Sequence, residues 1–333
     1  MSNRTPRAMG IVVIFLLFAA ALRAQTDQSP HTVQMIPVDK DVKLEVLDWG
    51  GIGRPLVLLT GLGDNTHVFD IFAPRLTANY HVYGITRRGF GNSSKPTPDA
   101  ANYTASRLGD DVLAVIDALH LARPIVAGHS IAGEELSYIG SQHADKVAGL
   151  IYLDAGYPYA IYDTVNGNFL IDAIDLREQL NRILPGSAPP EDMKKALEGL
   201  IASLKLVEKE ASEQRASMED IPAPPGLRPP APPVGVAIMN GQQRFTRINA
   251  PALFIYVAPH DLGQAMKDNP KARAAMEAND KRSVERQITA VEHEVLSAHV
   301  VRLPNANHYV FRSNEADVLR EMNDFIAALP AAN

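Results

Sequence analysis

The apolar positions along the chain predict an alternation of strands and helices. The segments 32–37 and 42–49 alternate apolar with polar residues on either side of a turn, which predicts a hairpin at one edge of a sheet. Strands and helices that alternate along the rest of the chain predict a mainly parallel sheet with helices on both faces. Short apolar runs predict the further strands, at 55–60, 81–86, 124–127, 147–154, 251–257 and 298–303. Helical patterns fall between these runs, at 68–76, 104–119, 134–139, 267–297 and 315–329.

This alternation is lost after residue 155. Helix-like patterns at 171–183 and 191–216 are followed by the run 221–233, in which seven of thirteen residues are proline. Such a run is expected to be extended, because proline cannot continue a helix or a central strand. We therefore expect a mostly helical insertion with a stiff return segment, and a disordered loop is the alternative. The expected division is a core at 32–155 and 249–330, with the insertion at 156–248.

The stretch 126–133 has the pattern of a strand, a sharp turn and a helix. Ser130 lies at the turn, with Gly128 two residues before it and Ala132 and Gly133 after it. A serine at such a turn can be held in a strained backbone conformation with its hydroxyl exposed, provided that its neighbours are small. The pattern makes Ser130 a candidate nucleophile, and an ordinary turn serine is the alternative.

On these residues and their order along the chain, the sequence resembles the α/β-hydrolase superfamily. Gly128-His129-Ser130-Ile131-Ala132 is similar to its nucleophile turn, with alanine where glycine is usual. Val257-Ala258-Pro259-His260-Asp261 and Asn305-Ala306-Asn307-His308 then follow apolar runs, in the superfamily's order of nucleophile, acid and histidine. The resemblance runs from about residue 40 to the C-terminus and implies a mostly parallel eight-stranded sheet with helices on both faces. It also implies that 156–248 forms a mainly helical cap over the active site.

The resemblance implies a catalytic triad of Ser130, His308 and Asp261. Serine is a poor nucleophile at neutral pH, so it needs a histidine base that is oriented by a carboxylate. Asp154 is the alternative acid, because it also follows a predicted strand and some members of the superfamily take their acid from that position. A surface histidine remains the alternative for His308.

The same resemblance implies an oxyanion hole made by the backbone N–H groups of Leu62 and Ile131. Leu62 belongs to a glycine-punctuated loop after a predicted strand, and an ordinary turn is the alternative. Arg87 and Arg88 are expected to tie loops together, and His129 is expected to pack or bond locally.

Composition excludes several kinds of site. The chain has no cysteine and no His-Glu-x-x-His motif, so we expect no metal site, no thiol nucleophile and no disulfide. The glycines at 89 and 91 lack the lysine or third glycine of a phosphate-binding loop. The formal charge of −6 gives no reason to expect nucleic-acid binding.

The first residues have the pattern of an export signal. Two arginines precede an uncharged stretch of 14 residues, Met9–Leu22. We expect a signal peptide at 1–24 cleaved after Ala24, with Ala21 as the other cleavage site, and a periplasmic or secreted protein without a stable membrane anchor. An uncleaved anchor or a core helix is the alternative. Loss of the three arginines in 1–24 would take the formal charge from −6 to −9.

The function that these features imply is hydrolysis of a carboxylic ester or lactone through an acyl-enzyme, with a small-molecule substrate and no cofactor. The tyrosines and apolar helices of the insertion suggest a moderately apolar acyl or aryl group. Relatives with an aspartate nucleophile, the dehalogenases and epoxide hydrolases, are disfavoured by Ser130. The alternatives are hydrolysis of amide or C–C bonds, or a hydrolase-like protein that binds without catalysis. The sequence does not indicate an oligomeric state.

Overall fold

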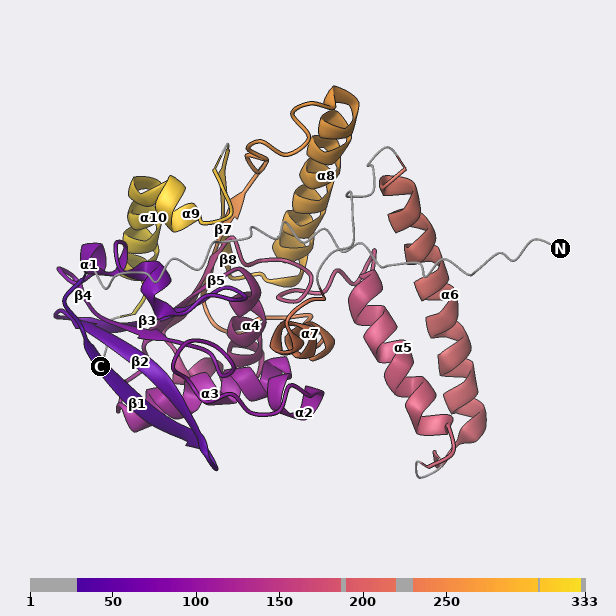
Figure 1. Ribbon diagram of the computed structural model, residues 1–333, viewed down its shortest axis with the longest axis horizontal. Coiled ribbons are helices and arrows are strands. Elements are labelled where there is room, and N and C mark those ends of the chain that lie inside the picture. Colours follow the sequence, from indigo (N-terminus) through magenta and orange to yellow (C-terminus); the bar gives the residue numbers. More distant parts are fainter. Residues whose placement is uncertain (1–28, 187–189, 220–229, 305, 331–333) are drawn as a thin grey trace.

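A computed structural model describes residues 29–186, 190–219, 230–304 and 306–330 (Figure 1). The predicted signal peptide, 1–24, lies outside the described residues, as does the part 221–229 of the proline-rich run. Among the helices of the described ranges, none combines the length and apolar character needed to cross a membrane.

The strands of the described residues form one eight-stranded sheet in the order β1-β2-β4-β3-β5-β6-β7-β8. The hairpin predicted at the edge is confirmed: β1 pairs antiparallel with β2, and β2 antiparallel with β4. All other neighbours are parallel, as the apolar runs predicted. The strands are β1 (Thr32–Asp39), β2 (Val42–Gly50), β3 (Arg54–Leu59), β4 (Tyr80–Ile85), β5 (Ile125–His129), β6 (Gly149–Leu153), β7 (Ala252–Val257) and β8 (Ala298–Leu303).

Helices cover both faces of the sheet (Figure 1). One face packs against α3 (Ala105–Ala118), α4 (Gly133–Gln142) and α8 (Pro270–Glu294) through a continuous apolar cluster. The other face packs against η1 (Thr66–Phe69), α1 (Ala73–Leu76), α9 (Val310–Ser313) and α10 (Glu315–Ala328). Every residue of β5, β6 and β7 is buried, as expected for central strands covered on both faces. The predicted fold class is therefore confirmed. The remaining short helices of the core are α2 (Ala100–Tyr103), η2 (Ser130–Ala132) and η3 (Ala144–Lys146).

A helical insertion separates β6 from β7. Its first two helices, α5 (Phe169–Ile183) and α6 (Met193–Ser217), lie side by side, away from the sheet (Figure 1). The third, α7 (Pro233–Asn240), was not predicted. Its first residue belongs to the run that was expected to be extended throughout, and that expectation is wrong at Pro233. Proline is well suited to the first turn of a helix, where no backbone hydrogen bond is required of its nitrogen.

Candidate active site

The turn between β5 and α4 holds Ser130 in a strained conformation. Ser130 has a φ of 55°, which is uncommon for a residue with a side chain. Small neighbours make the turn possible: a Cβ on Gly133 would lie 2.0 Å from the carbonyl oxygen of Ala155, and one on Gly128 would lie 2.9 Å from the Cβ of Ala132. Because Gly128 has no side chain, the turn accommodates alanine at 132.

Ser130 lies at one end of a line of hydrogen bonds. His308, in the loop after β8, has its Nε2 2.8 Å from Ser130 Oγ. Its Nδ1 lies 2.7 Å from Oδ2 of Asp154, the residue that follows β6. The distances are those of a nucleophile, a general base and an orienting carboxylate. The side chain of His308 is 35% exposed, whereas Asp154 is fully buried, so the line runs from solvent into the core.

The expectation that Asp261 contacts His308 is wrong, and the alternative acid, Asp154, takes that position. Asp261 is exposed, and its carboxylate accepts a hydrogen bond from the N–H of Gly263 at 2.8 Å. Its own N–H donates to Ala306, which fixes the loop with the carboxylate turned outward. In this loop the side chain directed at the buried site is that of the preceding residue, His260.

Asp154 is held by its backbone and by several donors. It has a φ of 47°, and Val257 donates its N–H to Oδ1 at 3.1 Å. The hydroxyl of Tyr157 donates to Oδ2 at 3.1 Å. Burial by itself would raise the pKa of Asp154, but hydrogen bonds from His260 and His308 outweigh burial and hold the pKa well below its usual range. Asp154 is therefore ionised at neutral pH.

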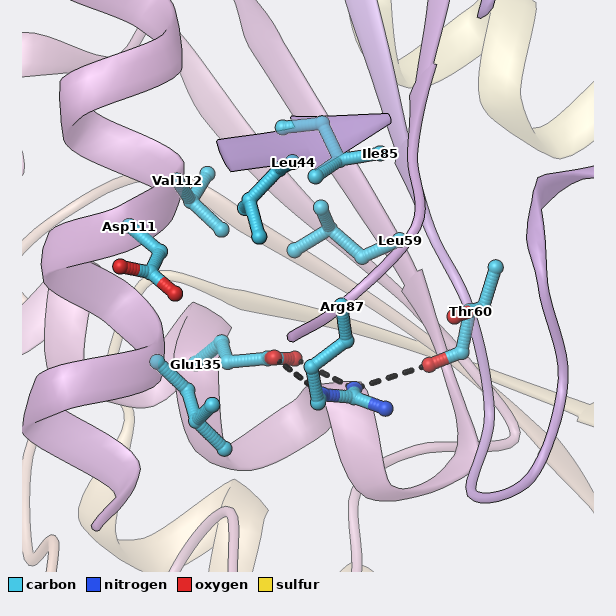
Figure 2. Close-up of a pocket in the computed structure, with 9 residues that line it drawn as sticks. Leu44, Leu59, Thr60, Ile85, Arg87, Asp111, Val112 and Glu135 are labelled. Atoms are coloured by element: carbon cyan, nitrogen blue, oxygen red, sulfur yellow. Dashed lines mark hydrogen bonds and ion pairs between the residues drawn. The ribbon is translucent and has the colours of Figure 1, made fainter. Parts of the chain in front are cut away.

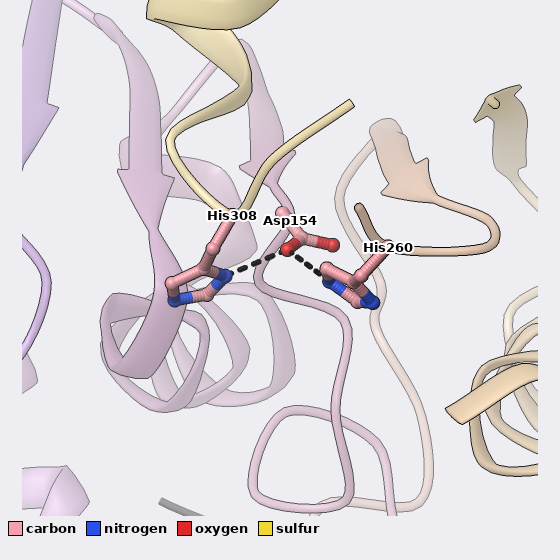
Figure 3. Close-up of side chains that lie close together, drawn as sticks. All are labelled: Asp154, His260 and His308. Atoms are coloured by element: carbon pink, nitrogen blue, oxygen red, sulfur yellow. Dashed lines mark hydrogen bonds and ion pairs between the residues drawn. The ribbon is translucent and has the colours of Figure 1, made fainter. Parts of the chain in front are cut away.

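His260 is a further member of this cluster, which the sequence analysis did not single out (Figure 3). Its Nε2 lies 2.9 Å from Oδ2 of Asp154, the same oxygen that contacts His308. The side chains of Asp154, His260 and His308 each have an atom that could bind a metal ion, and these atoms lie within 4.8 Å of one another. The separations of 2.7 and 2.9 Å are hydrogen-bond distances, shorter than the roughly 3.4 Å between two ligands of a tetrahedral zinc ion. Hydrogen bonds between the side chains account for the cluster.

The buried side chain of Arg87 holds the start of the loop that carries Leu62, through its hydrogen bond to Thr60 (Figure 2). Arg87 donates to the carbonyl oxygens of Thr60 and Gly61 at 2.9 and 3.3 Å. It also pairs with Glu135 of α4 through two hydrogen bonds of 2.6 and 2.8 Å, as the structural role predicted for Arg87 requires. In a trans peptide the C=O and N–H groups point in opposite directions, so the N–H of Leu62 points away from Arg87. The cavity beside Arg87 has a volume of about 10 Å³, too small for a substrate.

His129 lies beside His308, and Tyr159 lies near Ser130. Burial lowers the pKa of His129 to about 3, so its ring is neutral. Its Nε2 lies 2.9 Å from the backbone oxygen of His308 and donates to it, which is the local bonding expected of His129.

Helix α7 brings apolar side chains to the two residues named for the oxyanion hole. Leu62 and Ile131 share a cluster with Val234, Ala237 and Ile238 of α7. Ile131 directly follows Ser130, and Leu62 lies in the loop after β3. The insertion thus supplies part of the wall around the site, and the oxyanion role of both N–H groups stays a prediction.

Comparison with known proteins agrees with the fold. Residues 56–321 match the model of the alpha/beta hydrolase family. The 2-(acetamidomethylene)succinate hydrolase of Mesorhizobium japonicum is 25% identical over 279 residues, which cover 84% of this chain and 90% of that protein. A crystal structure of E-2-(acetamidomethylene)succinate hydrolase covers 90% of this chain and 100% of its own, with a TM-score of 0.53 and 21% identity.

A fluoroacetate dehalogenase from a Burkholderia species is 34% identical over 119 residues. That match spans 35% of this chain and 39% of the dehalogenase. The family match, in contrast, extends over most of the chain, from β3 into α10, and so includes the turn at Ser130 and the loops of Asp154 and His308. The resemblance expected from the sequence is confirmed: the chain belongs to the alpha/beta hydrolase family.

Proposed function

We propose that the protein is a serine hydrolase that cleaves a carboxylic ester or lactone through an acyl-enzyme intermediate. The observation that carries the proposal is the line of hydrogen bonds from Ser130 Oγ through His308 to Asp154, at 2.8 and 2.7 Å. All three residues follow the C-terminal ends of parallel strands, which is where open α/β sheets keep their sites. No cofactor takes part in this chemistry.

Each residue has a defined step in the proposed reaction. Ser130 Oγ attacks the carbonyl carbon while His308 Nε2 takes its proton. The N–H groups of Leu62 and Ile131 stabilise the negative oxygen of the tetrahedral intermediate, by roughly 3 kcal/mol for each donor. The leaving alcohol then takes the proton from His308. Water attacks the acyl group by the same route, which releases the acid and restores the serine.

Asp154 stabilises the imidazolium form of His308 during both steps. Because His308 Nδ1 donates to Asp154, its Nε2 is left as the acceptor that faces Ser130. The fixed tautomer and the buried negative charge are what make His308 an effective base.

Displacement of a halide or opening of an epoxide is a poor fit to Ser130. A serine oxygen that displaces halide from carbon would form an ether, which water does not hydrolyse under these conditions. Turnover by that route needs a carboxylate nucleophile, whose ester product water can cleave. The similarity to a dehalogenase over 119 residues is therefore taken as shared fold.

Amide hydrolysis is the second candidate. The Mesorhizobium protein that aligns with 84% of this chain is named for a substrate with an acetamido group. An amide nitrogen is a worse leaving group than an alcohol and needs the same proton from His308. The apolar residues of α7 beside Leu62 favour a moderately apolar acyl or aryl group in either case.

The test is hydrolysis of p-nitrophenyl esters, from acetyl to longer acyl chains, with the matching p-nitroanilides. We expect ester turnover by the wild type and a loss of about 10⁴-fold or more in kcat for Ser130→Ala. Ser137→Ala is the matched control, because Ser137 lies on α4 with its hydroxyl bonded to buried Tyr152. Ester turnover that survives Ser130→Ala would reject the proposal. Turnover of the anilides without turnover of the esters would support amide hydrolysis instead.

A further inference from the structure

His260 lies between two carboxylates. Its Nε2 is 2.9 Å from Asp154 Oδ2, and its Nδ1 is 2.9 Å from Oδ1 of Asp280 on α8. Asp280 also accepts the backbone N–H of His260 at 3.0 Å through its other oxygen, so the ring is held at a fixed angle. Only 10% of the His260 side chain is exposed.

This geometry requires two ring protons on His260. A neutral imidazole has one N–H, and its other nitrogen carries a lone pair. A lone pair at 2.9 Å from a carboxylate oxygen would be repelled, whereas an imidazolium donates to Asp154 and Asp280 at once. Burial opposes the charge, but the hydrogen bonds to Asp154 and Asp280 outweigh it and raise the pKa of His260 to about 10.

The charge on His260 acts on the oxygen that serves His308. Oδ2 of Asp154 accepts from His308, from His260 and from the hydroxyl of Tyr157. The two imidazole rings lie 6.3 Å apart. A cation at that distance partly neutralises Asp154 and so opposes protonation of His308.

We propose that His260 is a positioning residue: held as a cation by Asp280, it fixes the carboxylate of Asp154 and keeps His308 in its base form at lower pH. The inference rests on the proposed serine hydrolase mechanism, because His260 acts only through Asp154. It extends the site by a second pair of a cation and a carboxylate, His260 of the loop after β7 and Asp280 of α8.

The other charged and titratable groups around His260 come from helix α8 and from the loops after β6, β7 and β8. Tyr157 of the loop after β6 lies with its hydroxyl 3.0 Å from His260 Nε2, and His308 comes from the loop after β8. Beside His260 is an open groove of about 470 Å³. Its charged lining is Asp261 of the same loop, with Arg273, Glu277 and Lys281 of α8. Two cations and two carboxylates balance one another there, so Asp154 and Asp280 dominate the field at His260.

The experiment measures kcat/KM against pH for p-nitrophenyl acetate in the full chain. In His260→Gln the amide can still donate to Asp154 but carries no charge. Protonation of His308 then becomes easier, and we expect the acid midpoint of the profile to move up by about one pH unit. The decrease in kcat/KM of His260→Gln should come from a lower kcat, with KM unchanged, because His260 acts through Asp154 rather than on the substrate.

His81→Gln is the matched control. His81 makes a hydrogen bond of 2.8 Å to Asp48, at the opposite end of the sheet from the active site. Its profile should match that of the wild type. Asp280→Asn provides an independent variant: it removes one of the two carboxylates that hold His260 as a cation. The acid midpoint should therefore also move up, but by less than in His260→Gln, because Asp154 still favours the charged ring.

The outcomes separate the two proposals. Retained turnover in Ser130→Ala would reject the serine mechanism itself. Turnover that depends on Ser130, with the same acid midpoint in wild type and His260→Gln, would overturn the role of His260 alone. If His260→Gln does not fold, nitrogen NMR of histidine-labelled wild type decides at pH 8, with the His260 signals assigned through Asp280→Asn. Two protonated ring nitrogens on His260 support the proposal, and a neutral ring overturns it.

Discussion

At the scale of single residues, Asp154 and Asp261 follow neighbouring strands, but only Asp154 reaches His308. Asp154→Asn keeps the volume of the side chain but loses the charge that stabilises the His308 imidazolium and its tautomer. We expect kcat for p-nitrophenyl acetate to fall by about 10³ to 10⁴-fold. Asp261→Asn, whose side chain is exposed and accepts from Gly263, should change kcat by less than about threefold. The reverse order of effects would assign the acid to Asp261.

The sequence was sufficient to select Ser130 and His308 as candidates but left the acid open. The serine has a local pattern of small neighbours around it, and the histidine has a position after the last predicted strand. Both carboxylates follow strands that end at the same edge, so neither spacing nor residue type separates them. The choice depends on the φ of 47° at Asp154 and on the N–H of Val257, which exist only in the folded chain.

At the scale of an element, the first turn of α4 carries two buried glutamates in opposite situations. Glu135 pairs with Arg87 at 2.6 Å, whereas both carboxylate oxygens of Glu134 have no hydrogen-bond partner. Burial, together with the neighbouring Glu135, raises the pKa of Glu134 well above its usual value, so the folded state favours the protonated form of Glu134. The same substitution should therefore have different effects at the two positions.

Glu135→Gln should lower the free energy of unfolding at pH 7 by about 3 to 5 kcal/mol, because it leaves the buried charge of Arg87 without its partner. Glu134→Gln should leave the free energy of unfolding at pH 7 unchanged or raise it. Glu134 keeps in the folded state a proton that the unfolded chain releases above pH 4.5, so the wild type loses stability as pH rises above that value. Urea unfolding at pH 5 and pH 7 measures both effects. Equal destabilisation by the two substitutions would contradict this assignment.

The helices of the core could be predicted better than those of the insertion. Core helices such as α3 pack one apolar face on the sheet, and that face leaves a periodic pattern in the sequence. Helix α7 follows a proline-rich run and is apolar on most of its surface, so its sequence has no such periodicity. Its place beside Leu62 and Ile131 depends on contacts between distant parts of the chain.

At the scale of the whole molecule, local patterns predicted the strands but not their order. β3 lies between β4 and β5, so two crossovers rearrange strands that are consecutive in sequence. The apolar runs are alike in β3, β5, β6 and β7, so they do not specify which strands become neighbours. That order brings the loops after β5, β6, β7 and β8 to one edge, where Ser130, Asp154, His260 and His308 meet.

The charge of His260 should also be visible in the stability of the whole protein. Its pKa of about 10 in the folded state exceeds the ordinary value of 6.5, so the folded chain binds this proton more tightly. The stabilisation is fully present below about pH 6.5 and is lost as pH rises to about 10, by up to roughly 1.4 kcal/mol per pH unit. We expect urea unfolding of the wild type to weaken between pH 6 and pH 9.5 more steeply than that of His260→Gln. Parallel curves for wild type and His260→Gln would show that His260 carries no extra proton in the folded state.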